Sequence, residues 1–137
     1  MFEFRLQKVL EFRKMQEGWA KDSYLDSRAA RLEVEAKILN VHTRRGNLLV
    51  NTPTDISSRR ALESTLLYLD AQEREEKLVL NILIAEEDTA LQAWHHAKRE
   101  LETLDRLRET ALEEHRLEEN RKEQAELDEW SVMRRAA

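Results

Sequence analysis

The fold is decided by the stretch Gly46-Asn47-Leu48-Leu49-Val50-Asn51-Thr52-Pro53, the strongest helix-breaking signal in the chain. Its glycine suits the left-handed position just past a helix end. Thr52 can cap the next helix, Pro53 suits its first turn, and Asp55 puts a carboxylate near the positive end of the helix dipole. We therefore expect one coiled-coil domain over 1–137, with a helix over about 4–45, a hairpin loop over about 46–53 and a helix over about 54–135.

The second of these helices has an unusual length. From Thr54 to Arg135 the sequence contains neither Pro nor Gly. At about 1.5 Å per residue this segment would be roughly 120 Å long, whereas ordinary helices average about 11–12 residues. Such a length suits a protein that spans a distance or is held by a partner, rather than one that encloses an active site.

The composition agrees with a coiled coil. Charged residues make up 37% of the chain, and the mean hydropathy is -0.73. The chain has only two glycines and one proline. This composition predicts an all-α fold, and we expect a long antiparallel two-helix coiled coil with a single-helix C-terminal overhang. The absence of cysteine excludes a disulfide or a thiolate metal site. No apolar run reaches the length of a signal peptide core or a membrane span, so we expect a cytoplasmic protein.

A heptad repeat marks the face of the second helix that meets a partner helix. Alternate steps of four and three residues from Leu62 to Ala111 visit fifteen positions, of which eleven are apolar. The large apolar residues that we assign to this seam are Leu62, Leu66, Leu69, Leu80, Leu83, Trp94, Leu101 and Leu104.

The first helix is less regular, with two apolar stripes displaced by about one residue. The first stripe contains Phe12, Met15 and Trp19. The second stripe contains Leu25, Ala29, Leu32, Ala36 and Leu39. We expect both stripes to pack on the second helix, with the drift that an underwound pair of helices allows.

Charge indicates which helices pair. Residues 1–60 hold 12 Lys and Arg against 8 Asp and Glu, or +4, and residues 61–137 hold 11 against 20, or -9. This favours antiparallel pairing within one chain; the alternative is a parallel homodimer in which each helix meets a copy of like sign. Pairing that starts at the hairpin places Phe4 near Leu101 and leaves the chain after about Leu104 without a partner helix.

That overhang has its own pattern. Residues 113–123 are polar nearly all round, which is typical of a solvated helix or one held by another protein. Leu127, Trp130 and Met133 then recur at a spacing of three. We interpret them as a binding surface; the alternative is that they fold back on Phe2 and Phe4.

Three blocks along the chain carry a family resemblance. The first is the opening Phe2-Glu3-Phe4-Arg5-Leu6-Gln7-Lys8-Val9-Leu10-Glu11-Phe12-Arg13. The second is the centre Ala90-Leu91-Gln92-Ala93-Trp94, followed by Lys98, Leu101 and Leu104. The third is the end Glu119-Asn120-Arg121-Lys122-Glu123-Gln124-Ala125-Glu126-Leu127-Asp128-Glu129-Trp130, with Arg134 and Arg135. In this order they resemble the start, the tryptophan segment and the charged tail of the FliJ family, the stalk-like proteins of the flagellar type III export apparatus.

The resemblance implies a coiled coil similar to the gamma subunit of rotary ATP synthases, located at the flagellar base and peripheral to the membrane. Its implied partners are the export ATPase hexamer, whose central pore it enters, the cytoplasmic domain of the export gate membrane protein, and export substrate chaperones. ATPase contacts would come from Leu6, Leu10, Arg13, Leu127, Trp130, Met133, Arg134 and Arg135. Gate contacts near the hairpin would come from Leu39 and Leu69, which match leucines of the family, and from His42, which stands where the family has a tyrosine. In place of the missing tyrosines, Leu48 and Leu49 offer an apolar tip for the same contact.

The sequence offers no catalytic constellation, so we expect no enzyme activity, cofactor or metal site. His95 and His96 are adjacent and point about 100° apart on a helix, so they cannot share one metal. The acidic net charge argues against a nucleic-acid partner, although Arg44, Arg45, Arg59 and Arg60 form a small basic cluster at the hairpin. Two alternatives to the flagellar stalk stay open: the related stalk of a virulence secretion system, and a purely structural spacer.

Overall fold

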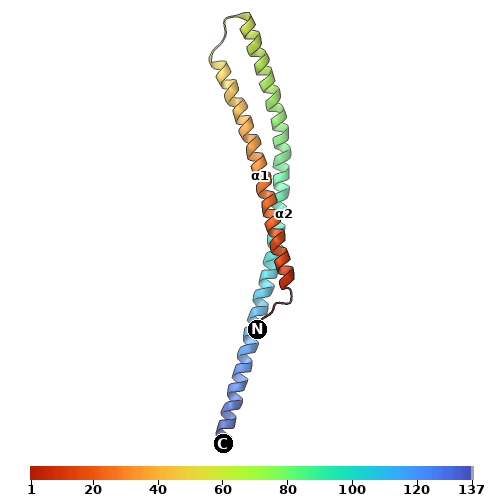
Figure 1. The fold of residues 1–137 in the computed structure, drawn as a ribbon, viewed down its shortest axis with the longest axis vertical. Helices are drawn as coiled ribbons and strands as arrows, with labels where there is room; N and C mark the ends of the chain where they lie inside the picture. The colour runs from red at the N-terminus through yellow and green to blue at the C-terminus, as the bar shows by residue number, and fades with distance from the viewer. Residues whose placement is uncertain (137) are drawn as a thin grey trace. The chain divides into compact units, whose positions relative to one another are not determined.

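The computed structural model describes residues 1–136 and contains two helices, α1 (Gln7–Val50) and α2 (Ile56–Ala136), with no strand in that range (Figure 1). The predicted all-α helical hairpin is therefore confirmed. The chain divides into two compact units. The hairpin unit comprises residues 19–94, and the terminal unit comprises residues 1–18 together with the chain from His95 onward.

In the hairpin unit, α1 and α2 run antiparallel and share one seam. The predicted seam positions of α2 in this unit, Leu62, Leu66, Leu69, Leu80, Leu83 and Trp94, are all buried or half-buried. On α1 the covered residues also follow a heptad spacing: Tyr24, Ser27, Arg31, Val34, Ile38, Val41 and Arg45. The seam therefore joins a leucine-rich face of α2 to a face of α1 that contains two arginines.

The predicted packing of α1 is wrong. Leu25, Leu32 and Leu39 are exposed to solvent, as are Ala29 and Ala36 between them. The seam instead runs through Tyr24, Arg31 and Ile38, one residue before each leucine, and through Ser27 and Val34, two residues before each alanine. Phe12, Met15 and Trp19 are exposed as well.

The ends of the helices differ from expectation at the hairpin. Gly46 lies inside α1 with an ordinary helical φ, and the helix continues to Val50 because Leu48 still packs in a half-buried position. The cap of α2 is Asp55, whose carboxylate accepts a hydrogen bond from the Ser58 N–H at 3.2 Å. The loop is therefore 51–55, and Thr52 and Pro53 lie before the cap rather than at it.

In the register of the hairpin unit, α1 ends before it reaches the level at which α2 begins. Arg45 is ion-paired with Glu73, Arg31 with Glu87, and the Tyr24 ring lies 5.5 Å from the ring of Trp94. These pairings place Val50 across from about Tyr68, so the first turns of α2 extend beyond the end of α1. Residues 51–55 form an extended connection from the end of α1 to the start of α2 (Figure 1). The expected tight hairpin register is wrong because this connection is extended.

The terminal unit pairs the start of the chain with α2. Arg13 is ion-paired with Glu100, and the Phe2 ring lies 5.4 Å from the His115 ring. Coverage of α2 therefore extends to His115 rather than ending at about Leu104, and Phe4 does not lie near Leu101. Leu101 and Leu104 are half-buried, as seam residues should be.

Candidate partner-binding surfaces

The C-terminal surface is the end of α2, where every residue from Arg116 to Ala136 is exposed. Leu127 and Trp130 are each 58% exposed, and Met133 is 71% exposed. The Arg134 guanidinium lies 5.2 Å from the centre of the Trp130 ring, which gives the aromatic face a cationic neighbour. The alternative in which this stripe folds back on the N-terminus is wrong, because Phe2 packs on His115 instead.

Only local contacts support this segment. Arg121 donates to Glu118 at 2.7 Å, and Gln124 donates to Asp128 at 3.1 Å. The Arg121 hydrogen bond lowers the pKa of Glu118 below its usual value. Such pairs each contribute about 0.2–0.5 kcal/mol to a helix. The helix in this segment is therefore weakly stable by itself, and a bound partner would stabilise it further.

The N-terminal residues expected to contact the ATPase are not equally available. Leu6 is half-buried, and Arg13 is engaged by Glu100. Leu10 is only 1% exposed. The Leu10 side chain fills the seam of the terminal unit, so it is not presented to a partner in this structure.

A second candidate surface lies at the hairpin. Leu39 and Leu49 are exposed and Leu48 is half-buried, so these predicted gate residues can present apolar surface. Leu69 is 0% exposed. This burial fits its predicted place in the seam, and its side chain is therefore not presented to the gate in this structure.

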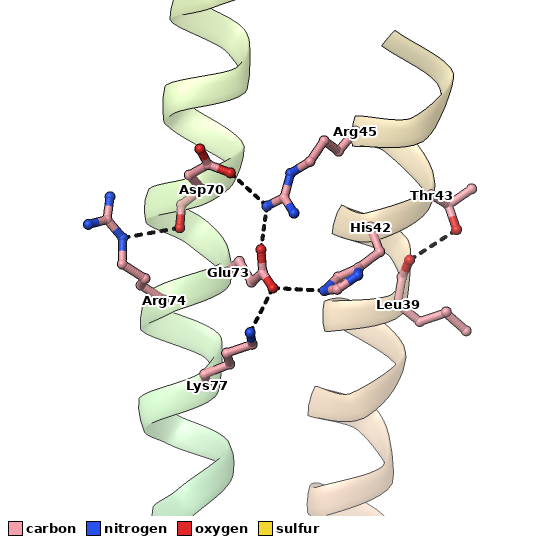
Figure 2. A network of polar contacts seen from close by, with 8 residues as sticks. All are labelled: Leu39, His42, Thr43, Arg45, Asp70, Glu73, Arg74 and Lys77. Atoms are coloured by element: carbon pink, nitrogen blue, oxygen red, sulfur yellow. Dashed lines mark hydrogen bonds and ion pairs between the residues drawn. The ribbon is translucent and has the colours of Figure 1, made fainter. Parts of the chain in front are cut away.

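His42, also assigned to the gate, belongs to a cluster of charges around Glu73 (Figure 2). Glu73 lies on the seam face of α2 and is buried. Its carboxylate accepts from His42 Nε2 at 2.8 Å and from Lys77 Nζ at 2.9 Å, and it also binds Arg45. The same Arg45 nitrogen reaches the Asp70 carboxylate at 2.8 Å. The cluster thus links one turn of α1, from His42 to Arg45, to the facing residues 70–77 of α2, and it fixes the register of the two helices at this point.

The electrostatics of the cluster follow from these contacts. Hydrogen bonds from Lys77 and then Arg45 lower the pKa of Glu73 to about 2, although its burial acts in the opposite direction. The Glu73 hydrogen bond also raises the pKa of Arg45. The carboxylate is therefore charged at neutral pH, and the pairing satisfies a charge that would be costly to bury alone.

This predicts a specific acid sensitivity. A carboxyl group whose pKa is depressed by folding stabilises the folded state above its unfolded value, here 4.5, and the contribution disappears as the pH falls through about 2. We expect Glu73→Gln to lower the melting temperature at pH 7 and the difference from the parent protein to shrink towards pH 2. Circular dichroism melts across this range measure it, with the exposed Glu63→Gln as control. An equal difference at both pH values would contradict the assignment.

Sequence analysis missed Arg31 and Arg45 as seam residues. Both donate to glutamates that the heptad of α2 had already placed on its seam, Glu87 and Glu73. The signal that could have revealed them was available: three glutamates at seam positions of α2 require basic partners on the facing helix. Apolar periodicity on α1 alone does not reveal these arginines.

The remaining titratable residues singled out in the sequence are His95 and His96. His96 lies 3.0 Å from Glu100, one turn along the same helix. Within residues 1–136 no group of three or more His, Asp or Glu is placed to hold a metal ion. No helix in the same range is long and apolar enough to cross a membrane.

Comparison with known proteins agrees with this architecture. A family model described as "Flagellar FliJ protein" matches residues 1–137, the whole chain. The chain belongs to the FliJ family. Searches of curated proteins and of solved structures gave no match. FliJ membership assigns the chain a stalk-type role in the flagellar export apparatus, and the FliJ family is a structural component of export rather than a known class of enzyme.

Proposed function

We propose that this FliJ protein is a non-enzymatic coupling stalk. In this proposal it inserts into the hexameric ring of the flagellar export ATPase, links that ring to the cytoplasmic domain of the export gate, and hands over substrate chaperones. It would act without a cofactor, peripheral to the membrane at the flagellar base. Family membership supports the flagellar setting over a virulence system.

One observation carries the proposal: α2 continues past its partner helix and ends in an exposed apolar stripe. Leu127, Trp130 and Met133 lie on a segment that is otherwise polar and solvated. A spacer needs no such stripe beyond its coiled-coil partner, whereas Trp and Arg often dominate binding energy at interfaces. Arg134 and Arg135 add positive charge in the last turn.

The hairpin would meet the export gate. Leu39, Leu49 and the half-buried Leu48 supply apolar surface there. His42 contacts Glu73, and 49% of its side chain remains exposed. Leu10 and Leu69 are left out of the proposed contact sets because both are buried. The N-terminal contribution to the ATPase is reduced to Leu6 and Arg13.

Truncation tests the ATPase part of the proposal. We expect a chain ending at Leu117 to keep its hairpin, because the removed residues are exposed and make only local contacts. It should no longer co-purify with the organism's export ATPase, while binding of the isolated gate domain should persist. Equal ATPase recovery with the full and truncated chains would instead favour a spacer role.

A further inference from the structure

An exposed heptad stripe on α1 has no partner within its own hairpin unit. It consists of Leu25, Ala29, Leu32, Ala36 and Leu39, spaced alternately by four and three residues. Leu25 is 44% exposed, Leu32 46% and Leu39 68%. At 100° per residue this outer stripe points nearly opposite the seam, so α2 cannot cover it. A regular 4-3 spacing on a solvent face is the pattern of a second coiled-coil contact.

The charges beside the outer stripe indicate what covers it. One rim carries Lys21 and Arg28, and the other carries Asp26 and Glu33. Among residues 1–136, none of these four side chains takes part in an ion pair of the chain's own. Glu35, the next residue on the first rim, is ion-paired with Arg31 of its own helix. From Lys21 to Glu33 the outer stripe therefore has one basic and one acidic edge, both available to a second helix.

We propose that the outer stripe binds the same stripe of a second copy, with the two α1 helices parallel. In a parallel pair the residue before one core layer faces the residue five positions later on the partner copy, and such flanking pairs set partner choice and orientation. Lys21 then faces Asp26 of the second copy, and Arg28 faces Glu33. In an antiparallel pair each rim would face itself, and the acidic edge would meet an acidic edge.

The geometry gives a closed dimer of hairpins rather than a filament. The two-fold relation uses the same patch on both copies, so the contact is self-complementary and ends at two chains. Because each α2 lies on the far side of its own α1, the second hairpin approaches without meeting it. From Leu25 to Leu39 the contact is only about 21 Å long, so we expect a weak dimer that forms only at high protein concentration.

Sedimentation velocity on the full chain at low salt tests this association. Between about 5 and 500 µM the mass should rise from monomer towards dimer, and added salt should weaken the dimer because the flanking charges are exposed. Leu32→Asp should remain monomeric over the whole range. Leu78→Asp, on the exposed surface of α2 away from the outer stripe, is the matched control and should dimerise like the parent protein.

Engineered cysteines test the parallel orientation, since the natural chain contains none. In a parallel pair every core residue faces its own copy, so Ala29→Cys and Ala36→Cys should each form an intermolecular disulfide well above the rate of Ala85→Cys, an exposed control on α2. An antiparallel pair brings at most one of these positions against itself. A monomer at 500 µM, an unaffected Leu32→Asp dimer, or crosslinking at fewer than both sites would overturn the proposal. If the parent protein is monomeric and Leu32→Asp abolishes binding of an export chaperone, the outer stripe binds a chaperone rather than a second copy, which also overturns the proposal.

Discussion

Leu69→Asp is expected to unfold much of the hairpin unit. Leu69 is completely buried in the seam between α1 and α2, so the substitution places an unpaired carboxylate where a leucine packed. The lost packing and the buried charge together should cost about 3–5 kcal/mol of unfolding free energy. Thermal and urea denaturation followed by circular dichroism measure the loss.

The neighbouring Leu67 provides the control for that result. It lies two residues away on the same helix but is 60% exposed. Leu67→Asp should leave the melting temperature almost unchanged, since surface substitutions usually stay within about 0.5 kcal/mol. If both variants melt like the parent protein, the two helices are not paired at Leu69 in solution.

The double variant Leu127→Ala with Trp130→Ala should lose at least about tenfold in ATPase binding, equivalent to about 1.4 kcal/mol. Both side chains are exposed on the C-terminal surface, and a partner that buries them gains the energy that the free chain cannot. Stimulation of the export ATPase should fall in parallel. Titration calorimetry and ATPase assays give the two measurements.

The same experiment separates binding from folding. The double variant should melt almost like the parent protein, because the stripe is exposed and its one cationic neighbour among the described residues is Arg134, one turn along the same helix. Leu117→Ala, an equally exposed leucine earlier in the same segment, should bind normally. Undiminished ATPase stimulation by the double variant would refute the proposed insertion, and a large loss of stability would mean that the stripe packs within the chain.

The sequence was informative about α2 and misleading about α1, for one physical reason. The seam of α2 is mostly apolar, with eleven apolar residues at its fifteen heptad positions, and hydrophobic periodicity finds it directly. The facing side of α1 contains Arg31 and Arg45, which the glutamates of α2 neutralise. A search for apolar residues on α1 therefore selected Leu25, Leu32 and Leu39, which form a genuine heptad but face outward.

The candidate sites show a similar division. The spacing of Leu127, Trp130 and Met133 was enough to predict that they lie on the C-terminal surface. No second helix runs beside this end of α2 among the described residues, so the three side chains are exposed. It could not separate Leu69, which is interior, from Leu39, which is exposed. That distinction depends on the register of the two helices, and the register depends on how far residues 51–55 extend, which local turn signals at Gly46 and Pro53 do not encode.

The extended connection in the hairpin unit acts as a tether of fixed reach. Val50 lies across from about Tyr68, so the chain must rise by roughly twelve residues of helix, or about 18 Å, before α2 begins at Ile56. Six peptide links at full stretch reach only about 20–22 Å. The tether therefore has almost no slack. Inserted residues would only lengthen the connection. Each deleted residue would have to be replaced by unwinding a helix end, or the two helices would have to shift in register and break the ion pairs that Arg31 and Arg45 make with α2.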